Sequence, residues 1–226
     1  MAVNFVERID DGVRIRNVLA SVSDKTGLDS FIPALVKINP DLRIYSTGGT
    51  YTALRDLLGP EAARHLVQVS DYTGQPEMQG GLVKTLDFKI YLGLLSETYN
   101  PAHVADLQRT QAVAIDMVIV NLYPFAQTVA KPDATVEKAR ANIDIGGPCM
   151  VRAAAKNFLR VASVTDPADY GWMAAELAGT QGVMPLKTRF ELARKAFAHT
   201  AAYDAAIAAY LKSRSYDDVK AMYRLG

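Results

Sequence analysis

Short apolar runs alternate with helix-like spacing along most of this chain. The runs are Val18 to Val22, Leu42 to Tyr45, Leu66 to Val69, Ile115 to Asn121 and Val161 to Thr165. Between the first two runs, apolar residues follow the i, i+3, i+4, i+7, i+8 spacing of an amphipathic helix: Leu28, Phe31, Ile32, Leu35 and Val36. The alternation predicts an α/β fold of three layers, a mainly parallel sheet covered by helices on both faces.

The remaining helical patterns complete this outline. Helices are predicted over residues 50–58, 102–112, 136–141, 149–157 and 186–211. Residues 70–95 contain four glycines and no steady period, so they are predicted to form a long loop with a short strand near its end. The pattern divides the chain into a domain over 1–185 and a C-terminal helical extension over 186–226, which packs on the domain or on a partner.

Composition narrows the class of protein. The chain has 226 residues, of which 50% are hydrophobic, enough to bury one substantial core. The 25 Lys and Arg residues nearly cancel the 24 Asp and Glu residues, so no overall field points to nucleic acid or to an anionic membrane. The single cysteine, Cys149, excludes an intrachain disulfide and fits a reducing cytoplasm. Together with three scattered histidines it argues against a cysteine-rich structural zinc site. Neither a signal peptide nor a membrane-spanning run is apparent.

Two predicted strand-to-helix turns carry small polar residues and glycine. The first is Ser21-Val22-Ser23-Asp24-Lys25-Thr26-Gly27, and the second is Ser46-Thr47-Gly48-Gly49-Thr50. Such turns lie at the same edge of a parallel sheet, where helix N-termini present free N–H groups to a phosphate. The Lys25 side chain would add a full positive charge there. Each turn taken alone is equally consistent with an ordinary helix cap.

The segment from Ile143 to Asn157 combines a carboxylate, a glycine pair and a lysine around one helix start. Pro148 suits the first helical position, which leaves Asp144 outside the helix. Lys156 follows Arg152 by one turn, and a buried pair of cations would lower the pKa of the lysine into the range of a useful acid or base. The alternative is an ordinary N-cap followed by a solvated basic face.

Two further segments carry candidate side chains. Lys84 and Thr85 lie in the glycine-bearing stretch, where a charge and a hydroxyl could contact a substrate. Asn121 and Tyr123 follow the run that starts at Ile115, so an amide and a phenol would lie at the sheet edge. The alternative for Lys84 is a surface lysine without a specific role. The alternative for Tyr123 is an aromatic side chain that only fills space at the end of the sheet.

Taken together, these segments resemble the inosine monophosphate (IMP) cyclohydrolase domain, the N-terminal half of the bifunctional purine-biosynthesis proteins that also contain an AICAR transformylase. The shared motifs are SVSDKTGL (21–28), STGGT (46–50), SDYTG (70–74), PEM (76–78), VKTL (83–86), NLYPF (121–125), NIDIGG (142–147), RAAAKN (152–157) and KAFAHTAAYD (195–204). The resemblance implies a methylglyoxal-synthase-like fold, no cofactor or metal, and a cytoplasmic homodimer. It implies closure of 5-formamidoimidazole-4-carboxamide ribotide, a purine ribonucleotide precursor, to IMP with loss of water. The chain is expected to be the cyclohydrolase alone and to depend on a separate transformylase.

The resemblance also implies roles for individual residues. Those matching the substrate-binding positions are Ser23, Lys25, Thr47, Gly48, Gly49, Thr50, Thr85, Ile145 and Gly146. Those matching catalytic positions are Lys84, Asn121, Tyr123, Asp144 and Lys156. We expect Lys156 to move a proton on one side of the substrate and Asp144 to orient the carboxamide. Lys84 and the Asn121 amide would stabilise the charge that grows on the formyl oxygen, and the choice of acid and base is open.

One loop departs from the family pattern. Leu82 stands where the family has an arginine of the pocket, and Asp87-Phe88 and Tyr91-Leu92 replace His-Pro and His-Gly pairs. The lost cation would weaken the binding of an anion unless Lys89 or Arg152 supplies another. The alternative function is therefore a catalytically degenerate module that binds a nucleotide or phosphate, senses a metabolite, or docks on a separate transformylase. A lyase like methylglyoxal synthase would share only the fold.

Overall fold

A parallel sheet of five strands, in the order β4-β3-β2-β5-β6, forms the centre of the molecule. The computed structural model describes residues 5–76 and 84–224. The strands are β2 (Asn17–Val22), β3 (Arg43–Ser46), β4 (Leu66–Gln68), β5 (Met117–Asn121) and β6 (Ala162–Val164), all within two residues of the predicted runs. The chain runs from β2 outward to β3 and β4 and then crosses back to β5 and β6 on the other side of β2, so the strand order reverses between β2 and β5. Such a switch point is where parallel sheets usually bind ligands.

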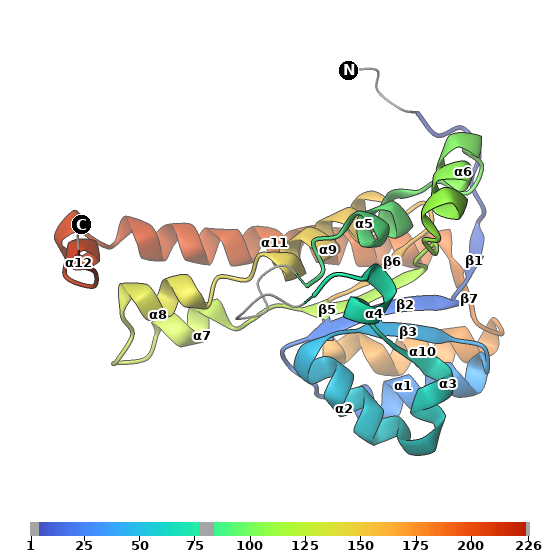
Figure 1. Cartoon of the computed structure of the whole chain (residues 1–226), viewed down its shortest axis with the longest axis horizontal. Helices are drawn as coiled ribbons and strands as arrows, with labels where there is room; N and C mark the ends of the chain where they lie inside the picture. Colours follow the sequence, from blue (N-terminus) through green and yellow to red (C-terminus); the bar gives the residue numbers. More distant parts are fainter. Residues whose placement is uncertain (1–4, 77–83, 225–226) are drawn as a thin grey trace.

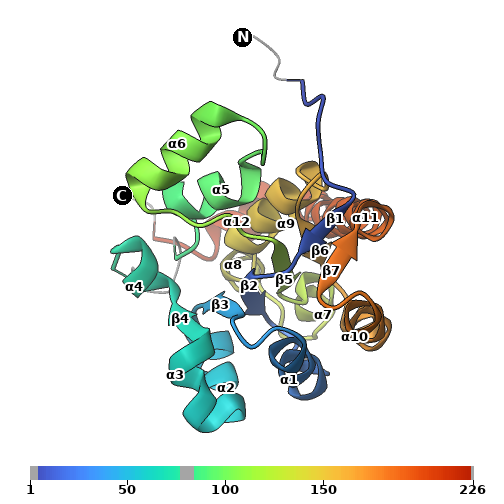
Figure 2. The same ribbon diagram turned by 90° about the vertical axis from the view of Figure 1, so that its right-hand side faces the viewer.

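Helices cover both faces of this sheet, as Figures 1 and 2 show. On one face lie α1 (Leu28–Ile38), α2 (Gly48–Leu58) and α10 (Tyr170–Gly179); on the other lie α5 (Phe88–Leu95) and α9 (Gly146–Lys156). Successive strand residues point to opposite faces, so Val18 belongs to one buried apolar cluster and Leu19 to the other. The predicted three-layer α/β fold is therefore confirmed.

The long helix α11 (Leu186–Lys212) runs beside β6 and α9 and then extends beyond the sheet (Figure 1). Its first half contributes Leu192 to one cluster and Ala193 to the other. Its second half packs on α7 (Phe125–Val129), where Tyr203 and Tyr210 both contact the ring of Phe125. None of the helices in the described residues combines the length and the apolar composition that crossing a bilayer requires.

The remaining elements are short. They are β1 (Gly12–Arg14), which pairs antiparallel with β7 (Val183–Pro185), the 3-10 turns Gly59–Glu61 and Pro167–Asp169, and the helices α3 (Ala62–His65), α4 (Val69–Thr73), α6 (Pro101–Thr110), α8 (Val136–Ala141) and α12 (Tyr216–Lys220). The predicted helices over 50–58, 102–112, 136–141 and 186–211 agree with α2, α6, α8 and α11 to within two residues.

Two local predictions are wrong. Residues 70–95 are not a loop that ends in a strand, because helix α5 occupies 88–95 and is capped by the Asp87 side chain, which accepts a hydrogen bond from Lys89 N. Gly93 lies inside this helix, and the position needs a glycine because a Cβ there would lie 2.4 Å from the Val113 carbonyl oxygen. Helix α9 begins at Gly146, so Pro148 is its third residue and not its first. Leu82, which stands where the resembled family has an arginine, lies outside the described residues.

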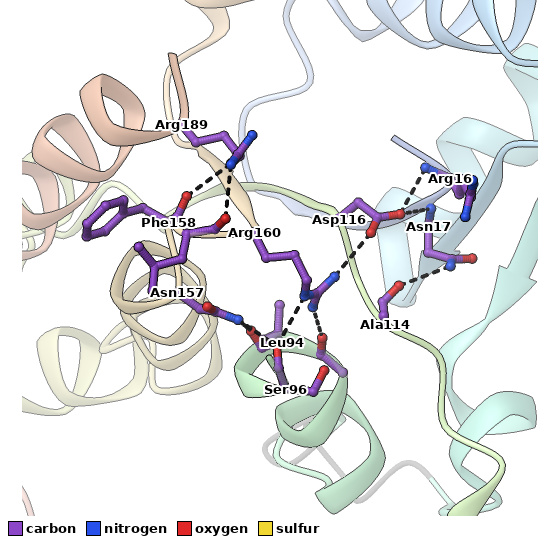
Figure 3. A network of polar contacts seen from close by, with 12 residues as sticks. Arg16, Asn17, Leu94, Ser96, Ala114, Asp116, Asn157, Phe158, Arg160 and Arg189 are labelled. Atoms are coloured by element: carbon purple, nitrogen blue, oxygen red, sulfur yellow. Dashed lines mark hydrogen bonds and ion pairs between the residues drawn. The ribbon is translucent and has the colours of Figure 1, made fainter. Parts of the chain in front are cut away.

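A buried polar network lies at the edge of the sheet where the parallel strands begin (Figure 3). We call this edge the amino-terminal edge. The guanidinium of Arg160 donates to Gly93 O (2.5 Å) and Ser96 O (3.1 Å) and pairs with Asp116 Oδ1 at 3.1 Å. The other carboxylate oxygen of Asp116 accepts hydrogen bonds from the backbone N–H groups of Arg16 and Asn17, both at 2.9 Å. This network ties the ends of α5 and α9 to the first residues of β2 and β5.

Candidate active site

A cavity of about 410 Å³ opens at the carboxyl ends of β2, β3 and β5, beside the switch point. It brings together thirteen of the residues singled out from the sequence: Ser23, Lys25, Thr47, Gly48, Gly49, Thr50, Lys84, Thr85, Asn121, Tyr123, Asp144, Ile145 and Gly146. Two helix starts meet here from opposite faces of the sheet, α2 at Gly48 and α9 at Gly146. The first N–H groups of each helix lack an intrahelical partner, so both starts favour negatively charged groups.

The start of α2 is surrounded by positive charge. Gly48 has φ +54°, a conformation that favours glycine, and a Cβ at this position would lie 3.2 Å from Lys84 Nζ. A Cβ at Gly49 would lie 4.0 Å from Lys25 Nζ. The buried hydroxyl of Thr50 joins this helix start to the end of β2 through hydrogen bonds to Val22 N and Val22 O. Two ammonium groups and a helix start therefore form an anion cradle, defined here as Lys25, Lys84 and residues 47–50.

The side-chain amide of Asn121 holds the turn after β2. Its Oδ1 atom accepts hydrogen bonds from Ser23 N (2.7 Å) and Asp24 N (2.8 Å), and its Nδ2 atom donates to Asp24 O at 2.7 Å. These contacts join the ends of β2 and β5 and fix the backbone that leads to Lys25. Most of the hydrogen-bonding capacity of this amide is thus used within the protein, which favours a positioning role over stabilisation of the formyl oxygen.

Lys84 and Thr85 connect the two helix starts. While the ammonium of Lys84 lies against Gly48, the hydroxyl of Thr85 lies against Gly146, where a Cβ would be only 2.8 Å from Thr85 Oγ1. Any side chain at position 146 would push Thr85 away. The glycine at the start of α9 therefore allows these neighbouring residues to reach both sides of the cavity.

Asp144 lies just before α9, with its carboxylate turned back on the helix start. Its Oδ1 atom accepts a hydrogen bond from Gly147 N at 2.8 Å, and a Cβ at Gly147 would lie 2.5 Å from Oδ2. Burial raises the pKa of the Asp144 carboxyl above its ordinary value of 3.8, while backbone hydrogen bonds from Gly147 and Tyr123 oppose this rise. A carboxyl group with a raised pKa at the wall of a cavity is suited to accepting and returning a proton.

Lys156 lies elsewhere. It is the last residue of α9, ten residues after Gly146, which is about 15 Å along the helix axis. Its side chain is exposed, and Lys156 is not one of the described residues that line this cavity. The cations suggested as substitutes for the family arginine also lie elsewhere: Lys89 Nζ donates to Tyr72 O at 3.2 Å, and the Arg152 guanidinium lies 5.5 Å from the Phe197 ring centre.

A second cavity, of about 690 Å³, lies on the other side of residues 121–125, between α7 and α11. Asn121 and Tyr123 line both cavities. The larger one has a mostly apolar wall, and its lysine, Lys195, is already paired with Asp169 at 2.5 Å. The smaller cavity holds both helix starts and both cradle ammonium groups, so we take it as the candidate active site.

Comparisons with known proteins agree with this choice. The family model described as the MGS-like domain matches residues 27–149, more than half of the chain. The chain belongs to the MGS-like domain family. The model described as AICARFT/IMPCHase bienzyme matches residues 154–225. Among solved structures of similar fold, "Crystal structure of ForH" has 34% sequence identity and a TM-score of 0.70, and the match covers 86% of this chain and 97% of that one.

Curated relatives of this MGS-like chain include bifunctional purine biosynthesis proteins named PurH. The protein of Neisseria meningitidis serogroup A is 52% identical over 205 residues, and that of Neisseria gonorrhoeae strain NCCP11945 is 49% identical over 212 residues. These matches cover 91% and 94% of this chain but only 37% and 39% of the relatives. The chain is thus homologous to a part of PurH and spans less than half of its length.

Several lining residues of the MGS-like site were given no individual role from the sequence, although most of them lie in the motifs named there. They are Ser21, Val22, Ala141, Asn142, Ile143, Gly147 and Met150. Most belong to the same motifs as the predicted residues, so the motifs locate them although the individual positions carry no separate signal. Tyr203 of α11 lies in the KAFAHTAAYD motif, but its contact with Asp144 N at 2.7 Å has no local signal because 59 residues separate the two in sequence.

Proposed function

We propose that this chain is an IMP cyclohydrolase, which closes 5-formamidoimidazole-4-carboxamide ribotide to IMP with loss of water in the last step of purine synthesis. The observation that carries the proposal is the joint occurrence of an anion cradle and a partly buried carboxyl in one cavity of about 410 Å³. The sequence identity of 52% to part of a bifunctional purine biosynthesis protein supports the same reaction.

Ring closure forms a bond between the carboxamide nitrogen and the formyl carbon. The bond between that carbon and the formyl oxygen then breaks. One proton from the carboxamide nitrogen and one from the former formamide nitrogen leave with the oxygen as water. The enzyme must hold the two reacting groups in contact, receive a proton at the nitrogen side and supply one to the departing oxygen.

The anion cradle suits the phosphate of the ribotide. Lys25 and Lys84 supply positive charge beside Gly48 and Gly49, and the N–H groups at the start of α2 supply donors. Thr47 and Thr50 belong to this cradle, and Ser23 lines the same cavity. A phosphate held there leaves the heterocycle free to lie toward the start of α9, where Thr85, Ile145 and Gly146 line the wall.

The carboxyl group of Asp144 suits the proton transfer. In our proposal the carboxylate accepts a hydrogen bond from the carboxamide NH₂, orients the nitrogen toward the formyl carbon and receives its proton. The phenol of Tyr123 is a donor within the cavity for the departing oxygen. A role for Lys84 at that oxygen stays a prediction, because this proposal uses its ammonium at the phosphate. Asn121 acts as a positioning residue through its contacts to the turn at 23–24. A catalytic role for Lys156 stays a prediction, and its distance from Gly146 gives that role no support.

We extend the proposal to the organisation of the protein. Residues 1–185 would form the catalytic domain, and residues 186–226 a helical extension. A homodimer in the cytoplasm is part of the same proposal and is supported by the resemblance to the purine-biosynthesis family. Light scattering of the purified chain would test the dimer, and a single-chain mass in solution would contradict it.

The test of the activity is direct. Purified protein is incubated with 5-formamidoimidazole-4-carboxamide ribotide, and formation of IMP is followed by absorbance and by chromatography. We expect turnover that is proportional to protein concentration and unaffected by chelators. Tight binding of IMP without any conversion of the ribotide would contradict the enzyme and favour a nucleotide-binding module.

A further inference from the structure

Helix α11 reaches the candidate active site through one side chain, Tyr203. The phenol oxygen of this buried residue accepts a hydrogen bond from Asp144 N at 2.7 Å and contacts Asn142 O at 3.4 Å, to which its proton is directed. Both partners belong to the turn that precedes α9. The turn contains the proposed proton acceptor, and one of its backbone N–H groups depends on a residue from the C-terminal helix.

The same side chain also touches the neighbouring loop. The ring of Tyr203 packs edge-on against Phe125, with centroids 6.2 Å apart and an interplanar angle of 70°. Phe125 follows Tyr123, which lines the candidate active site and donates a backbone hydrogen bond to the Asp144 carboxylate. Tyr203 thus contacts both segments that surround the Asp144 carboxyl, one through its hydroxyl and one through its ring.

The hydroxyl matters because residue 144 lies outside the helix. Its N–H group has no place in the hydrogen-bond ladder of α9, which begins at Gly146. A buried N–H without a partner is unfavourable, and such a turn would relax toward water. Any relaxation would move the carboxylate relative to the substrate, and displacements of about 1 Å are enough to slow catalysis strongly.

We propose that Tyr203 is a positioning residue of the reaction, which holds the Asp144 turn in its active geometry through the hydrogen bond to Asp144 N. This inference rests on the proposed cyclohydrolase function. It assigns to the C-terminal helix a part in catalysis, although none of the substrate contacts proposed above comes from α11. The chain beyond residue 185 is then required for turnover as well as for stability.

The variant Tyr203→Phe tests the hydroxyl alone, because the ring that packs on Phe125 remains. Tyr210→Phe is a matched control. Tyr210 is also buried on α11 and packs edge-on against Phe125 at 5.9 Å, but its hydroxyl has no hydrogen-bond partner among the described residues. Both variants are compared with the wild type in kcat, KM and the exchange rate of the Asp144 amide proton.

We expect Tyr203→Phe to lower kcat about tenfold with KM changed less than about twofold, the size of effect that one hydrogen bond can have. Tyr210→Phe should leave both unchanged. In an Asp144→Asn background, Tyr203→Phe should have no further effect on kcat, because its effect passes through the carboxyl group. An unchanged kcat for Tyr203→Phe, or full additivity of the two changes, would overturn the inference.

Amide exchange separates this inference from the proposed reaction. The Asp144 amide should be protected in the wild type, exposed to exchange in Tyr203→Phe and protected in Tyr210→Phe. Exchange that is equally slow in all three proteins would contradict the positioning role whatever the activity. A wild-type protein that never forms IMP would instead contradict the proposed function, while the exchange result would still report on the Tyr203 contact.

Discussion

The ammonium group of Lys84 lies 3.2 Å from the point that a Cβ would occupy at Gly48. A lysine from the segment between β4 and α5 is therefore in contact with the start of α2, which follows β3. Because Gly49 has the same relationship to Lys25 at 4.0 Å, two cations share one helix start. This relationship defines the anion cradle and gives the first prediction.

Replacing Gly48 by alanine should weaken the cradle. The new methyl group would force Lys84 Nζ to move and would sit on a backbone with φ +54°. We expect KM for the ribotide to rise more than about tenfold. Gly59→Ala is the matched control, since Gly59 has the same φ of +54° but no atom within 4 Å of its new methyl group. An equal loss of activity in both variants would attribute the effect to backbone strain and not to the cradle.

Lys25→Met should reduce affinity for the phosphate specifically. We expect the Kd of IMP to rise about tenfold or more, the size expected for one charged hydrogen bond, with a weaker dependence on salt. Inosine, which lacks the phosphate, should bind both proteins equally. Calorimetry with the two ligands measures the difference, and the exposed Lys37→Met at the end of α1 serves as the control. A parallel loss of inosine binding would mean that Lys25 supports the pocket and not the phosphate.

Asp144→Asn should remove most of the turnover and leave the fold intact. Burial raises the pKa of the wild-type carboxyl, so the rate should rise with pH through a limb above 3.8, and this limb should be absent from the variant.

The raised pKa of Asp144 also makes the free energy of unfolding depend on pH. Protonated Asp144 stabilises the fold at low pH, and this contribution is lost as pH rises through the raised pKa. Thermal unfolding across that range checks this: a wild type that gains stability over the variant with rising pH would contradict it.

Arg160→Met should destabilise the protein strongly without touching the cavity. The change leaves Asp116 as a buried carboxylate without its cation, a loss of about 3–5 kcal/mol in comparable cases. Burial already raises the pKa of Asp116, so part of the loss should be recovered at lower pH. Denaturant unfolding provides the measurement. Arg109→Met, which breaks the exposed pair with Asp106, should cost less than about 1 kcal/mol. Similar losses of unfolding free energy in the two variants would mean that the buried pair of Arg160 and Asp116 contributes no more to stability than an exposed pair.

The sheet and most of the site could be predicted because their signals are local. Each strand is a short apolar run, and parallel strands bring the turns after them to one edge, so residues 23–25, 47–50 and 121–123 meet. Gly93 misled the prediction of a loop because its small size serves a contact with Val113 O, 20 residues later in the chain. Nothing in the local pattern of residues 88–95 reports that contact.

The roles of Lys156 and Tyr203 show what sequence spacing leaves open. Spacing relates Lys156 correctly to Arg152 on one helix face, but it does not say at which edge of the sheet that helix ends. Tyr203 joins the site only because α11 folds back beside α7 and α9. Both questions depend on contacts between segments distant in sequence.

Helix α9 runs from the cavity to the amino-terminal edge of the sheet, and hydrogen bonds hold both of its ends. At one end Gly147 N is held by Asp144; just past the other, Asn157 Nδ2 donates to Leu94 O and Ser96 O. We expect a small axial shift at one end of this helix to reach the other, because eleven residues joined by backbone hydrogen bonds deform little along the axis. Arg160 and Asn157 donate to the same carbonyl oxygen, Ser96 O, so substitutions around Arg160 should also shift this end of the helix. Some variants selected for heat resistance should then show altered turnover although none of their substitutions lies in the cavity lining.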